Sequence, residues 1–452
     1  MNLSTEENLA GRDALAEVVV CLAKQALVTT PNKTVAWTSH PLLAALKAAG
    51  TRHIYTDTAD KTELDDLLVA GETEKHLTFV EEIDGNTTNQ ALVDKVLPQY
   101  FEERGAANLT KWARELQRAQ PALGLTEIVP LLYTIINGRL GRQFKAYYGA
   151  GRKNGRSWEI SLELHTGLAG DAEASRRVAG YLARMVPGSF VKVAFTPHEP
   201  HCLLIARDLE RQGIRVNFTT TFSVRQVAAA ALLANVARTN IFMGRLNQGL
   251  EAELLGEQVD LAAQRLLRKL RRQYDLKTQL IVASVRDWKT LVHAAGCDVF
   301  TVPYKTLKDF LTQKEIGPKE IRSQLESDYS GLLGVSAKVL EKIGSARLAQ
   351  LYQIEPDYLR FLVELRRSPD FDKLDGDGLF KKFDHAGFGE VFYSPTPVEW
   401  QELRKNKLPD LDSPLTKKLP LDTLYSLLAV ADFMKFQEGM DQRIAERIHE
   451  VL

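Results

Sequence analysis

The feature that most restricts the fold of this chain is a repeated alternation of strand-like and helix-like segments. Helical patterns such as 199–212, 224–236 and 249–275 separate apolar runs that are rich in β-branched residues. Such alternation requires parallel strands joined by crossover helices, and eight strands predict a closed (β/α)8 barrel. The candidate strands are 53–59, 77–85, 159–164, 190–196, 215–222, 238–244, 279–285 and 298–304.

Two segments exceed a simple barrel. Residues 90–157 predict a long helical insertion after the second strand, and residues 311–452 predict a mostly helical C-terminal extension that packs by the barrel. Turn-rich sequence interrupts that extension over 368–414. We therefore expect a catalytic barrel domain over 1–310, which includes an N-terminal helix, followed by the extension.

The charge balance narrows the range of partners. Lys+Arg and Asp+Glu both number 58, so no basic field covers the whole chain, and neither nucleic acid nor a membrane is an expected partner. Any anion site must be built locally from a few cations. Three widely spaced cysteines, Cys21, Cys202 and Cys297, argue against a disulfide framework and fit a reducing cytoplasm.

Several predicted strands carry polar residues at every second position. Strands of a parallel barrel are normally apolar on both faces, and successive side chains point to opposite faces. Lys192 alternates with Val191 and Val193, and the same alternation places Glu163, Asn217 and Thr219 on the inner face of their strands. A charge inside a barrel is costly unless it is paired or functional.

These residues suggest chemistry at an amine. A confined lysine has its neutral form favoured, and a neutral amine can attack a ketose carbonyl to form an imine, with carboxylates such as Glu163 and Asp57 moving the protons. Each residue also has an ordinary structural explanation. Lys192 could extend to solvent, Asp57 could cap a helix, and Asn217 and Thr219 could bond to backbone.

At this point the sequence resembles the transaldolase family of class I Schiff-base aldolases, as a long variant. Seven motifs occur in the family's order across about 50–310, and together they cover the predicted barrel. They are YTDTAD (55–60), DGNTTNQAL (84–92), VKVAFT (191–196), GIRVNFTTTFSVRQ (213–226), IFMGRL (241–246), ASVRDW (283–288) and AGCDVFTVP (295–303). The family's lysine lies on barrel strand four, which is also where the strand count places Lys192.

The resemblance implies a role for each matching residue. Lys192 would form the imine, Asp57 would act as acid or base beside the breaking bond, and Glu163 with Thr219 would activate a water. No metal or organic cofactor is implied, because the lysine supplies the electron sink. The residues that would bind the sugar phosphate are Asn89, Asn217 and Asn240 for its hydroxyl groups and Arg245 and Arg286 for its phosphate. An ion pair at the surface is the alternative role for the arginines.

The sequence departs from the family at three places. Gln90-Ala91 replaces the usual Pro-Ser, and Asn240-Ile241 replaces a Ser-Pro whose serine helps to bind substrate, so the substrate is in doubt. The lysine strand leads into PHEPHC (197–202), where His198, Glu199, His201 and Cys202 could bind a metal or pack in a loop. This is not an HExxH motif, and Pro200 breaks the required helical spacing, which favours packing.

Three functions fit these observations. The first is transaldolase activity, which moves a dihydroxyacetone unit between sugar phosphates. The second is a fructose 6-phosphate aldolase that releases dihydroxyacetone; such enzymes lack the strand-three glutamate and use a tyrosine, whereas this chain has Glu163 and Phe242. The third is a non-enzymatic sugar-phosphate-binding protein. Sugar phosphates are the expected partners in each case, and a homo-oligomer is possible.

Overall fold

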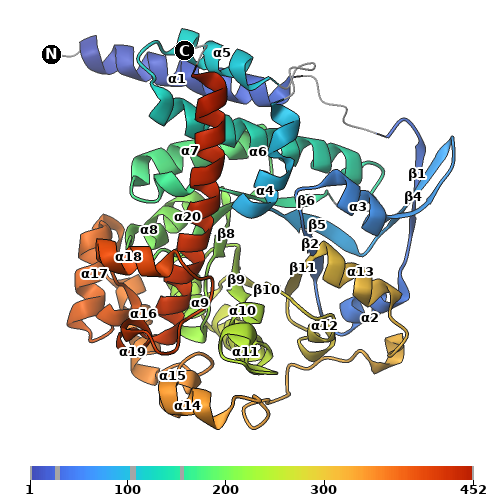
Figure 1. The fold of residues 1–452 in the computed structure, drawn as a ribbon, viewed down its shortest axis with the longest axis vertical. Coiled ribbons are helices and arrows are strands. Elements are labelled where there is room, and N and C mark those ends of the chain that lie inside the picture. The colour runs from blue at the N-terminus through green and yellow to red at the C-terminus, as the bar shows by residue number, and fades with distance from the viewer. Residues whose placement is uncertain (1–2, 26–30, 102–107, 153–156, 450–452) are drawn as a thin grey trace.

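A computed structural model describes residues 3–25, 31–101, 108–152 and 157–449. Eight parallel strands close into a barrel, with helices around them and a helical extension at the C-terminus (Figure 1). The predicted (β/α)8 barrel is therefore confirmed. Its strands, in chain order, are β2 (His53–Asp57), β5 (Ile83–Thr87), β6 (Glu159–Glu163), β7 (Phe190–Ala194), β8 (Arg215–Thr219), β9 (Arg238–Phe242), β10 (Gln279–Ala283) and β11 (Val299–Pro303).

The prediction for the second barrel strand was wrong. We expected it over 77–85, but the barrel strand β5 covers Ile83–Thr87, whereas β4 (His76–Val80) belongs to a separate sheet. That sheet pairs β4 in parallel with β1 (Thr34–Thr38) and in antiparallel with β3 (Val69–Glu72), two strands that the pattern did not predict. Two short strands lie so close in sequence that they resemble one long strand.

The helices agree more closely with the pattern. Around the barrel, α7 (Ala172–Met185), α8 (His201–Arg211) and α11 (Leu255–Tyr274) follow β6, β7 and β9. The segment expected as one helix over 224–236 divides into α9 (Val224–Ala229) and a π-helical turn (Ala230–Ala234). The expected insertion contains α4 (Gln90–Val96), α5 (Leu109–Ala119) and α6 (Leu125–Gly149).

At the amino-terminal ends of the strands, the barrel interior is filled by paired charges. Arg238 Nη2 donates to Glu159 Oε2 at 3.0 Å, and Arg215 Nη1 donates to Glu159 Oε1 at 3.1 Å. Burial lowers the pKa of Arg238 to about 9, which shows how strongly the interior disfavours charge. Some polar residues of the inward faces are thus structural, and only those near the carboxyl ends of the strands are available for chemistry.

The final helix α20 (Leu421–Ile448) passes over the mouth of the barrel. It runs from α18 (Pro397–Leu403) and α19 (Pro414–Lys418) at one end to α4 and α5 at the other (Figure 1). A buried ion pair fixes its start, because Arg225 on α9 donates from Nε and Nη2 to the two carboxylate oxygens of Asp422, at 2.7 Å each. This bidentate contact sets where α20 meets the strand ends.

Candidate active site

Lys192 lies inside the barrel, held by two acceptors. Its Nζ donates to Glu163 Oε2 at 2.9 Å and to the Thr88 carbonyl oxygen at 2.8 Å. The register of β6 and β7 puts Glu163 directly beside Lys192, and that of β7 and β8 puts Asn217 on its other side. Lys192 is only 5% exposed and Glu163 only 3%, so the predicted inward orientation of both residues is observed.

Two carboxyl groups near the amine have raised pKa values. Burial raises the pKa of Glu163 above its ordinary value, although the hydrogen-bonded Lys192 lowers it in part. Burial also raises the pKa of Asp57, against which Lys192 and a 2.6 Å hydrogen bond from Thr87 Oγ1 act. A carboxyl whose pKa moves toward neutrality is suited to exchange protons near pH 7.

A cavity of about 130 Å³ opens above Lys192 at the carboxyl ends of the strands. This is the end of a (β/α)8 barrel where active sites are built. Inside it, Asn240 Nδ2 donates to Asn217 Oδ1 at 3.4 Å, and Asn217 Nδ2 donates to Ser161 Oγ at 3.2 Å. The cavity brings together seven of the nine predicted site residues, namely Asp57, Asn89, Lys192, Asn217, Asn240, Arg245 and Arg286.

The two predicted phosphate-binding arginines line this cavity, Arg245 from the short helix α10 (Met243–Gly249) and Arg286 from the loop after β10. Arg245 Nη2 donates to Asp432 Oδ2 on α20 at 2.9 Å, whereas buried Arg245 Nη1 has no hydrogen-bond partner in the part of the chain that the structure describes. A glycine lets α10 approach this loop, because a Cβ on Gly244 would lie 2.0 Å from the Ser284 carbonyl oxygen. The Phe-x-Gly-Arg sequence therefore has a steric reason for its glycine.

Asn89 and Thr219 are placed differently from the other predicted residues. Asn89 caps α4, with its Oδ1 accepting from Leu92 N at 3.0 Å, while it also lines the cavity. Thr219 is fully buried on β8. It lines neither this cavity nor a second, larger cavity that also adjoins Lys192. Its hydroxyl has no hydrogen-bond partner among the described residues.

Comparison with known proteins identifies the family to which the barrel sequence belongs. The family model described as transaldolase/fructose-6-phosphate aldolase matches residues 54–343, well over half of the chain. This chain belongs to that family. A transaldolase of Chlamydia muridarum is 25% identical over 277 residues, which cover 59% of this chain and 80% of that protein.

Two further relatives match over a smaller share of the chain. Probable transaldolases of Aquifex aeolicus and Bacteroides thetaiotaomicron are 31% and 32% identical over 151 and 157 residues, 33% and 34% of this chain. Those matches span 63% and 65% of the relatives' own lengths. The family model ends well before α20, so the C-terminal helix must be understood from its own contacts.

The PHEPHC segment of this transaldolase-family chain packs as a loop over 197–200 and the first residues of α8. The His198 ring meets Trp400 edge-on with centroids 4.8 Å apart, and burial lowers the pKa of His198 to about 4. Burial raises the pKa of Cys202 to about 11, and its thiol points to the Thr196 carbonyl. Within the described residues, no group of three or more His, Cys, Asp or Glu is arranged to hold a metal ion.

Sequence reasoning missed two contacts that α20 makes with the site. One is the Asp432 carboxylate on Arg245. The other is Asp441, which lies 2.9 Å from His165 Nε2. Because His165 Nδ1 accepts from Gly167 N at 3.0 Å, Nε2 carries the ring proton and donates it to Asp441. No sequence spacing signals such pairs, since each joins a residue that follows a barrel strand to a helix far along the chain.

No helix within the described segments is both long and apolar enough to cross a bilayer. Four expectations stay predictions. They are the roles of the individual residues, the division at residue 310, the cytoplasmic location and the homo-oligomer.

Proposed function

We propose that this chain is a transaldolase that moves a dihydroxyacetone unit through an imine on Lys192. In this reaction sedoheptulose 7-phosphate and glyceraldehyde 3-phosphate give erythrose 4-phosphate and fructose 6-phosphate. The observation that carries the proposal is the position of Lys192 Nζ. It is buried, bonded to Glu163 at 2.9 Å, and lies beneath a cavity that contains three asparagines and two arginines.

The first half of the reaction removes an aldehyde. Glu163 accepts a proton from Lys192, whose neutral Nζ then adds to the ketose C2 carbonyl, and loss of water leaves an iminium ion. Asp57 takes the proton from the C4 hydroxyl while the C3–C4 bond breaks. The bonding electrons pass into the iminium to give an enamine, and the aldehyde leaves. The family resemblance gives Thr219, whose hydroxyl has no hydrogen-bond partner among the described residues, the role of holding the water that Glu163 activates.

The second half reverses these steps with another aldehyde. The enamine carbon attacks the acceptor carbonyl, Asp57 returns its proton to the new alkoxide, and water hydrolyses the iminium to release the ketose. Arg245 and Arg286 hold the phosphate at the far end of the cavity, and Asn89, Asn217 and Asn240 bind hydroxyl groups along the chain. Arginine suits phosphate because its planar guanidinium donates two parallel hydrogen bonds.

A fructose 6-phosphate aldolase is the second candidate. It would share the imine but release dihydroxyacetone to water. Two features favour transfer: Glu163 is present at the lysine, and Phe242, which lines the cavity, has no hydroxyl to act as a tyrosine acid. A binding protein without activity would not need Lys192 and Glu163 buried as a pair, because burying two charges is costly.

Trapping with borohydride tests the proposal. Fructose 6-phosphate and borohydride should add a reduced dihydroxyacetone unit to Lys192, detected by peptide mass spectrometry, and Lys192→Ala should lose the adduct. Equal labelling of both proteins would refute the imine at Lys192. Product analysis with and without erythrose 4-phosphate then separates the two enzymes. A transferase forms sedoheptulose 7-phosphate, whereas an aldolase releases free dihydroxyacetone at the same rate in both assays.

A further inference from the structure

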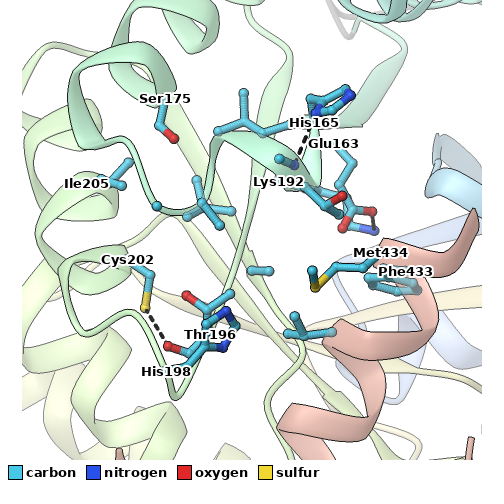
Figure 2. Close-up of a pocket in the computed structure, with 18 residues that line it drawn as sticks. Glu163, His165, Ser175, Lys192, Thr196, His198, Cys202, Ile205, Phe433 and Met434 are labelled. Carbon is cyan, nitrogen blue, oxygen red and sulfur yellow. Dashed lines mark hydrogen bonds and ion pairs between the residues drawn. The ribbon is translucent and has the colours of Figure 1, made fainter. Parts of the chain in front are cut away.

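A second cavity, here called the side chamber, adjoins Lys192 on the side away from the arginines. Its volume is about 220 Å³, and it shares Lys192 and Phe433 with the cavity of the arginines. Figure 2 shows Lys192 and Glu163 on one wall and Phe433 and Met434 of α20 on another. Lys192 therefore lines two adjoining spaces, of which the proposed sugar-phosphate reaction uses one.

The walls of the side chamber are mainly apolar. Polar groups in the walls mostly have partners: His165 is bonded to Asp441 and Gly167, and Ser175 Oγ donates to the Leu168 carbonyl at 2.7 Å. Such walls offer few hydrogen bonds to the hydroxyl groups of a sugar. The apolar lining comes from Leu164, Val193, Ala194, Ile205, Val430 and Met434.

We propose that the side chamber binds an apolar arm of the carbonyl substrate that forms the imine on Lys192. The inference rests on the proposed function, because it needs the imine. An imine carbon bonded to Nζ carries two other substituents, and these point in different directions. With the phosphate-bearing arm beneath Arg245 and Arg286, the other arm lies toward the side chamber. The inference thus adds a second substrate class beside the sugar phosphates: a ketone with one anionic arm and one alkyl or aryl arm.

The volume sets the size of that arm. An apolar protein cavity of about 150 Å³ accommodates a benzene ring. The side chamber, at about 220 Å³, therefore accepts a short alkyl chain or a single ring. Each methylene buried there should strengthen binding by about fourfold, until the chamber is full.

The test is reductive trapping of Lys192 with methyl ketones of increasing length: acetone, butanone, pentan-2-one and hexan-2-one. Lys192 Nζ adds to the carbonyl carbon, water leaves, and borohydride reduces the iminium to a secondary amine. The ketone concentration that gives half-maximal labelling should fall by about fourfold for each added methylene. A series without dependence on chain length overturns the inference.

Three variants of α20 sharpen the test. Met434→Trp fills the side chamber and should abolish the dependence on chain length, whereas Met434→Ala enlarges it and should extend the dependence to longer ketones. Lys435→Trp adds the same ring at an exposed neighbouring position and should behave as wild type. An unchanged series in Met434→Trp overturns the inference.

Fructose 6-phosphate serves as the reference in every variant. Its labelling of Lys192 reports a folded, competent site and separates the two proposals. If fructose 6-phosphate does not label the wild type while the ketone series rises, the sugar-phosphate substrate of the proposed function is refuted, whereas the imine on Lys192 and the side chamber stand. If fructose 6-phosphate labels every variant while the ketone series is flat, the proposed function stands and the side chamber fails.

Discussion

Asp432 offers a direct test of the predicted phosphate site, because its carboxylate is hydrogen-bonded to Arg245, one of the two arginines, before any substrate binds. Its Oδ2 accepts from Arg245 Nη2 at 2.9 Å, and both side chains are buried. Arg245 Nη1 is left to donate to a phosphate, since it has no partner among the described residues. A phosphate at that position would bring its negative charge close to the Asp432 carboxylate. Asp432→Asn should therefore strengthen the binding of sugar phosphates.

The size of the effect follows from Coulomb's law. Two like unit charges about 6 Å apart repel by about 3 kcal/mol at an effective dielectric constant of about 20. Lys407 Nζ, 3.3 Å from Asp432 Oδ1, offsets part of this repulsion, and Arg286 across the cavity offsets more. If about half remains, the gain is about 1.4 kcal/mol, or tenfold in affinity. We expect the Kd for fructose 6-phosphate to fall by about tenfold.

Titration calorimetry at low ionic strength measures this change, with inorganic phosphate as a second ligand. Glu438→Gln is the matched control, because it removes the same charge from an exposed position of α20 where Glu438 pairs with Arg404 at 2.8 Å. Because Glu438 is exposed to solvent, which weakens its charge interactions, Glu438→Gln should change the Kd by less than about twofold. Unchanged or weaker binding in Asp432→Asn would refute the reasoning and would mean that Asp432 orients Arg245 instead of competing with the phosphate.

Two further predictions concern the frame around the site. Burial raises the pKa of Asp260 far above its ordinary value, and neither carboxylate oxygen has a partner among the described residues, so its charged form destabilises the fold as pH rises. Asp260→Asn should stabilise the protein by about 2 kcal/mol at pH 8 in urea unfolding and lose this gain towards pH 4; an equal gain at both pH values would contradict this reasoning. Gly244→Ala should cost about 2 kcal/mol and weaken phosphate binding, because its Cβ would meet the Ser284 carbonyl at 2.0 Å. Gly439→Ala, where nothing lies within 4 Å, should cost nothing, and equal losses in the two variants would argue against the clash.

The sequence predicted the barrel well because eight strand-like runs alternate with helical segments, and within those strands polar and apolar residues alternate with a period of two. That period put Lys192, Glu163 and Asn217 on inward faces, and strand order then made them neighbours. The strand prediction failed at 77–85, where two short strands of different sheets follow each other with two residues between them. Pairing between strands is a tertiary property, so a local pattern cannot divide such a run.

The contacts of α20 could not be predicted for a related reason. Asp432 and Arg245 are separated by 187 residues, and His165 and Asp441 by 276. Nothing in the composition of an amphipathic helix tells which of its carboxylates will meet a buried arginine. The side chamber was equally inaccessible to sequence reasoning, because a cavity is defined by what three separate segments leave unfilled.

The division of labour between the barrel and α20 explains how such a chain could change its substrate while keeping its chemistry. The groups proposed to make and break bonds, Lys192, Glu163 and Asp57, all lie on barrel strands whose spacing the barrel fixes. Helix α20 instead contributes Asp432 beside Arg245, the arginine proposed to bind phosphate, and Phe433 between the two cavities. Substitutions on α20 can therefore alter the charge and width of the site without moving the amine. For this reason α20, and not the barrel, is where we expect substrate choice to be set.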